Sequence, residues 1–136
     1  MPELAALVIA ASLGAMVFFP SIVAPTIFRI LPEDKAGLFL RAVFPNYFLI
    51  NGVAALLAAA IAVRPLESGL LAACAAMMLA VRIVAIPIIN NARDLMLSGD
   101  VAAKDQSNLW HPGTVIANTA EMIILVIIAC LLLGYD

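Results

Sequence analysis

The chain has 136 residues, of which 65% are hydrophobic and only 12% are charged, and its formal net charge is -2. Its mean hydropathy is +1.14. A soluble domain of this size could not bury so much apolar surface, whereas a bilayer accommodates about 20 apolar residues in each spanning helix. The slight acidic excess argues against a nucleic-acid partner. The composition therefore predicts an integral membrane protein whose first partner is the lipid bilayer.

Four apolar segments follow one another along the chain, and each is long enough to cross a bilayer as a helix. They predict an all-α fold, a single transmembrane four-helix bundle over residues 1–136 with helices at about 4–30, 36–63, 65–97 and 112–133. The first segment lacks a basic stretch before its apolar core, so we expect it to remain in the membrane and not to be cleaved as a signal peptide.

Prolines interrupt the apolar segments at positions 20, 25, 45 and 87. A proline lacks the backbone donor and clashes with the preceding turn, so at least three helices are expected to be kinked or broken. Pro112, in contrast, is expected in the first turn of the last helix, where proline is well tolerated. This places His111 at the N-cap of that helix.

The last apolar segment carries four polar residues on one helical face, at steps of three, four and three: His111, Thr114, Asn118 and Glu121. Lipid does not accept such groups, so they are expected to face the protein interior. At about 1.5 Å per residue, Glu121 lies roughly 13 Å from Pro112, and Arg82 lies roughly 12 Å from Asn90 on the preceding antiparallel helix. The matching depths predict a buried ion pair between Arg82 and Glu121.

Further polar residues on the second and third helices extend this stripe into a candidate ligand-binding site. Asp94 is expected to neutralise Arg93 or to cap a helix end. We expect a polar vestibule that opens toward the cytoplasm and is closed at its inner end by the Arg82 to Glu121 pair. Alternatively, this pair has only a structural role and holds the two helices together. The candidate site residues are Arg41, Asn46, Arg82, Asn90, Arg93, Asp94, His111, Thr114, Asn118 and Glu121.

The basic residues suggest an orientation in the membrane, because Lys and Arg favour the cytoplasmic side. One side of the four-helix layout has Arg64 alone, whereas the other collects Arg29, Lys35, Arg41, Arg93 and Lys104. This predicts that both termini lie outside, with the plasma (inner) membrane as the expected location.

The third helix offers a weaker metal signal and a packing signal. Cys74 and Met78 are four residues apart and could hold a soft ion such as Cu(I). Ala72, Ala76 and Ala80 form a row of small residues that favours close helix packing, within the bundle or in a homodimer.

Motifs of enzymes are not found in the sequence, so no catalytic residue is assigned and an enzymatic role is not favoured. The chain has one histidine, so haem with two histidine ligands would need a symmetric dimer.

Four motif segments, 20–29, 44–48, 90–94 and 109–113, together with Asn118, resemble the successive signatures of the small four-helix membrane family named after transmembrane protein 205. The resemblance implies a multi-pass membrane protein with a poorly defined biochemical role, connected with resistance to platinum drugs. It singles out Arg29, Pro45, Tyr47, Asn90, Arg93, Asp94, His111 and Asn118. A more distant similarity to CopD-type copper-resistance proteins and HemJ-type protoporphyrinogen oxidases would imply metal, haem or porphyrin.

Three functional classes therefore remain open. The first is a carrier or exporter that binds a small solute or soft metal ion in the polar site, with protonation of Glu121 coupled to movement. The second is a redox membrane protein that binds haem or porphyrin near His111. The third is a structural or assembly subunit without a ligand of its own.

Overall fold

Four long helical spans make up the fold in the computed structural model, which describes residues 2–134. The spans are Pro2–Ile30, Glu33–Ile61, Pro65–Leu97 and Ala102–Leu133, and each is long and apolar enough to cross a membrane. Their order and positions confirm the expected all-α architecture, with four helices compatible with a membrane bundle.

Two of the spans are interrupted by a π-helical turn. The first contains α1 (Pro2–Phe18), the π-turn η1 (Phe19–Val23) and α2 (Ala24–Ile30), and the third contains α4 (Pro65–Ala80), the π-turn η2 (Val81–Ala85) and α5 (Ile86–Leu97). Each π-turn ends two residues before a proline, Pro25 or Pro87. Because proline cannot donate the helical hydrogen bond, the wider turn lets the helix continue past it.

The other two spans are continuous α-helices. Pro45 lies inside α3 (Glu33–Ile61) and Pro112 lies inside α6 (Ala102–Leu133), so π-turns interrupt two of the four described spans. The last helix also begins at Ala102 and not at Pro112, so His111 is not an N-cap. Just before its first turn, Asp100 Oδ1 accepts the Ala102 backbone N–H at 2.9 Å.

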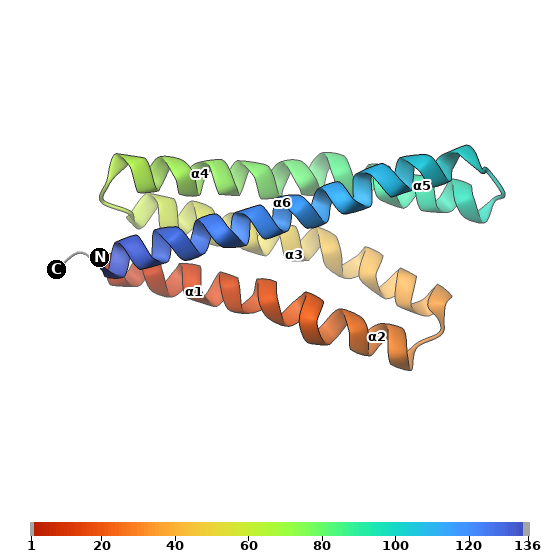
Figure 1. Cartoon of the computed structure of the whole chain (residues 1–136), viewed down its shortest axis with the longest axis horizontal. Coiled ribbons are helices and arrows are strands. Elements are labelled where there is room, and N and C mark those ends of the chain that lie inside the picture. The colour runs from red at the N-terminus through yellow and green to blue at the C-terminus, as the bar shows by residue number, and fades with distance from the viewer. Residues whose placement is uncertain (1, 135–136) are drawn as a thin grey trace.

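The helices pack tightly at one end of the bundle and diverge at the other (Figure 1). The start of α1, the end of α6 and the α3 to α4 connection lie at the tight end, where α3 packs on α4 and α1 packs on α3 and α6. The α2 to α3 and α5 to α6 connections lie at the opposite, open end. There α2 contacts α3 but neither α5 nor α6 in the described part of the chain.

The apolar core belongs mainly to the tight half. Its largest fully buried apolar side chains come from α1, α4 and α6: Ile9, Met16, Leu71, Met78, Leu125 and Ile128. Gly52 on α3 allows the close approach of α4, because a Cβ there would lie 3.3 Å from the Cβ of Met78. Ala72, Ala76 and Ala80 are exposed and so face away from this core.

Candidate functional site

A cavity of about 710 Å³ occupies the open half of the bundle and is lined by all four spans. Its walls are mostly aromatic and aliphatic, with contributions from Phe19, Phe28, Leu40, Phe44, Phe48, Ile86, Ile89, Met96 and Met122. Six of the ten candidate site residues line it as well: Arg41, Asn90, Arg93, His111, Thr114 and Asn118. The structure thus brings these six together, although in a cavity that is more apolar than the expected vestibule.

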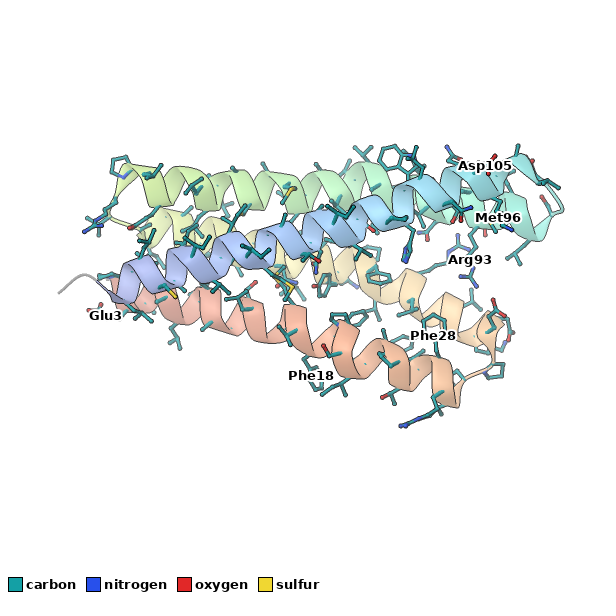
Figure 2. All side chains as sticks on the ribbon, in the orientation of Figure 1. Glu3, Phe18, Phe28, Arg93, Met96 and Asp105 are labelled. Atoms are coloured by element: carbon teal, nitrogen blue, oxygen red, sulfur yellow. The ribbon has the colours of Figure 1, made fainter. Side chains whose placement is uncertain are left out.

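At the open end, the first turns of α3 and the last turns of α5 form the mouth of the cavity, which we define by Glu33, Gly37, Arg93 and Leu97. Figure 2 shows Arg93 extending from α5 toward the first turns of α3. Gly37 is buried, and a Cβ at this position would collide with the Arg93 guanidinium. The glycine therefore provides the space through which Arg93 reaches α3.

The Arg93 guanidinium has no hydrogen bond or ion pair to any residue that the structure describes. Asp94 forms its direct ion pair with Arg41, while the Arg93 charge lies within electrostatic range of the same carboxylate. Arg41 Nη1 and Nη2 donate to the two carboxylate oxygens of Asp94 at 2.6 and 2.8 Å, a bidentate pair between α3 and α5. Arg41 and Arg93 both line the cavity, whereas Asp94 does not. Because Arg41 is paired with Asp94, Arg93 is the guanidinium at the cavity that remains able to bind a ligand.

The expected ion pair between Arg82 and Glu121 is also absent from the described residues. Arg82 Nε donates to the backbone carbonyl oxygen of Pro45 at 3.0 Å. Glu121 is 1% exposed, and neither of its carboxyl oxygens has a hydrogen-bond partner in the part of the chain that the structure describes. The prediction was wrong because equal depth along two helices does not set the direction of their side chains, and Arg82 lies in the π-turn that changes the rotation of its helix.

Tyr47 and Asn118 meet at the inner end of the cavity, which we call its floor. The Tyr47 hydroxyl donates to Asn118 Oδ1 at 2.9 Å, and Asn118 Nδ2 contacts Met122 Sδ at 3.6 Å. Tyr47 also belongs to an aromatic cluster with Phe19 and Phe44, whose ring centroids lie 5.3 and 6.4 Å from its own. The floor therefore joins η1, α3 and α6 through both aromatic and polar contacts.

A second polar contact lies in the buried part of the bundle and was not predicted. Ser12 Oγ donates to Asn51 Oδ1 at 2.6 Å, and Asn51 Nδ2 donates to the Tyr47 carbonyl oxygen at 2.9 Å. A single serine in an apolar segment is a weak sequence signal, and only the depth match with Asn51 could have indicated the contact.

The remaining candidate residues have local roles. Asn46 is exposed, and its Nδ2 donates to the Ala42 carbonyl oxygen of its own helix at 3.4 Å. Thr114 Oγ1 donates to the His111 carbonyl oxygen at 2.8 Å. Cys74 and Met78 are both buried, and no group of three or more His, Cys, Asp or Glu side chains gathers among residues 2–134.

Comparison with known proteins identifies a family. The chain matches the family model described as "Domain of unknown function (DUF4149)" over residues 7–98, which covers most of the first span and all of the second and third. The chain therefore belongs to this family. No curated protein and no solved structure matches it.

Proposed function

We propose that this family member binds a small amphipathic solute carrying an anionic group, and that it carries or exports this solute across the membrane. The supporting observation is the unpaired Arg93 guanidinium at the mouth of a cavity with an aromatic and apolar interior. A guanidinium binds carboxylate or phosphate through charge-assisted hydrogen bonds. The apolar walls would hold the hydrocarbon part of the solute.

Access from the membrane is supported by the way the helices diverge. Because α2 contacts neither α5 nor α6, the described helices do not close the cavity between them. Phe28 of α2 lines the cavity and is 53% exposed. An amphipathic solute that is already dissolved in the bilayer could therefore reach the cavity sideways, with its charged group near the membrane surface.

The orientation and kinship of the protein are part of the same proposal. The open end carries the excess of Lys and Arg, which supports a cytoplasmic position in a plasma (inner) membrane and termini outside. The four motif segments support kinship with the family named after transmembrane protein 205, and through it a role in resistance to metals or drugs. The exposed row of Ala72, Ala76 and Ala80 supports a homodimer.

Binding of an anionic and a neutral amphipath tests the proposal. The purified protein in lipid nanodiscs would be titrated with anthroyloxy-labelled stearic acid and with the matching stearyl alcohol. We expect the acid to bind about tenfold more tightly or better, because a hydrogen bond to a charged group contributes about 1.5–3 kcal/mol. The substitution Arg93→Gln should abolish this preference without changing the affinity for the alcohol.

The matched control is Arg29→Gln, since Arg29 is an exposed arginine near the same end that does not line the cavity. It should leave the preference intact. Equal affinities for acid and alcohol in the unmodified protein, or the same loss in both variants, would contradict the proposal.

The alternative function, binding of haem or porphyrin, would use the same cavity, because His111 lines it. The only histidine of the chain could supply one axial ligand, so two-histidine ligation would require a second copy. A Soret band in the purified protein that disappears in His111→Ala would favour this alternative, and a colourless protein would count against it.

A further inference from the structure

Glu121 is a buried carboxyl group that none of the described contacts uses. Its side chain is 1% exposed, and both carboxyl oxygens lack a hydrogen-bond partner among residues 2–134. It lies near the middle of α6, within a helix that is apolar enough to cross a membrane. An ionised carboxylate without partners in such surroundings is very unfavourable, and binding a proton removes its charge.

Among the described residues, none of the groups that face Glu121 offers a compensating positive charge. Tyr47 of α3 and Cys74 of α4 lie within electrostatic range of its carboxyl group, and both are neutral in their ordinary state. On η2, Arg82 directs its Nε to the Pro45 carbonyl oxygen. The buried polar side chain on α1 is Ser12, which donates to Asn51.

Glu121 lies directly behind the floor of the cavity. It follows Asn118 by three residues, about one helical turn, on the same face of α6. Asn118 and Tyr47 line the cavity, and Glu121 does not. Tyr47 thus lines the cavity and also lies within electrostatic range of the Glu121 carboxyl group, and its hydroxyl can both donate and accept a hydrogen bond.

We propose that Glu121 is a proton-binding site in the membrane interior and that it exchanges its proton with the cavity past the Tyr47 to Asn118 hydrogen bond. In the loaded state the proton is covalently bound to one carboxyl oxygen. In the exchange step this O–H bond breaks and the proton passes to water in the cavity, and uptake is the reverse. The site is independent of which solute the cavity binds.

Infrared spectroscopy of the whole protein in liposomes tests the site without a transport assay. At neutral pH, the unmodified protein should show the carbonyl stretch of a protonated carboxylic acid, and this band should be lost in Glu121→Gln. Identical spectra of the two proteins would overturn the proposal. Should Glu121→Gln fail to fold, labelling of the unmodified protein with dicyclohexylcarbodiimide, located by mass spectrometry, replaces it.

In that labelling experiment Glu67 is an internal control, because it is 5% exposed but pairs with Arg64 at 3.6 Å. The reagent needs a protonated carboxyl group, so modification of Glu121 and not of Glu67 is expected. An unmodified Glu121 would overturn the proposal.

The exchange path is tested by transfer into D₂O, which shifts the carbonyl band as the proton is replaced. The shift should be several-fold slower in Tyr47→Phe, which lacks the hydroxyl, than in the unmodified protein. Phe44→Leu is the control, because Phe44 lines the cavity and contacts Tyr47 but has no exchangeable proton. Equal rates in Tyr47→Phe and in the unmodified protein would contradict the assigned path.

Discussion

Replacement of Glu121 by methionine should stabilise the protein. Both carboxyl oxygens are buried without partners in the described structure, and such a polar group costs about 1–3 kcal/mol by comparison with mutational data. Methionine has a similar length, is unbranched and adapts to irregular spaces, so it should remove this cost without leaving a large cavity. We therefore expect the free energy of unfolding of Glu121→Met to rise by about 1–3 kcal/mol.

The sign of this change distinguishes the observed arrangement from an ion pair with Arg82. Breaking a buried pair by removing one partner costs about 3–5 kcal/mol, so a paired Glu121 would give a destabilised variant. Reversible unfolding in mixed detergent micelles, followed by circular dichroism, measures the difference. Glu67→Met is the control, because Glu67 is buried but pairs with Arg64 and should give no gain. A destabilised Glu121→Met, or an equal gain in both variants, would refute the reasoning.

Other substitutions test the packing of the tight half by the same unfolding measurement. Ser12→Ala should destabilise the protein by about 1–3 kcal/mol, because it leaves Asn51 Oδ1 buried without its donor; an unchanged stability would mean that the contact is not formed. Gly52→Val should cost about 1–3 kcal/mol, because the added side chain would separate α3 from α4. Gly14→Val, at a position with no neighbour within 4 Å, should cost little, because valine has a higher helix propensity than glycine; a loss equal to that of Gly52→Val would contradict the packing explanation.

The spans could be predicted from sequence because apolar length alone determines whether a segment can cross a bilayer. The third span was predicted at its observed bounds, Pro65–Leu97. The start of the last helix was missed because its first turns are polar, and hydropathy detects only the apolar part of a helix. Pro112 was interpreted as the first turn of the helix, whereas it lies inside this continuous helix.

The gathering of some candidate residues around one cavity could be predicted from helix geometry. Helical spacing placed His111, Thr114 and Asn118 on one face, and all three line the cavity. Partners were harder to predict, because a contact between helices depends on the rotation of each one. Arg82 was predicted to pair with Glu121 because the two lie at equal depth. It lies in the π-turn η2, however, and its Nε donates to the backbone carbonyl oxygen of Pro45.

The π-turn at Val81–Ala85 holds one residue more than the α-helical turn that it replaces. Deletion of one residue there would restore a regular α-helical turn and leave the later residues of the span at nearly the same rotation, so Arg93 would stay beside Gly37. Deletion of one residue after the π-turn, between Ala85 and Arg93, has no such compensation and would rotate the residues that follow by about 100°. Within this family, a single-residue gap after the π-turn would therefore mark a member with a different mouth, whereas a gap inside the π-turn would not.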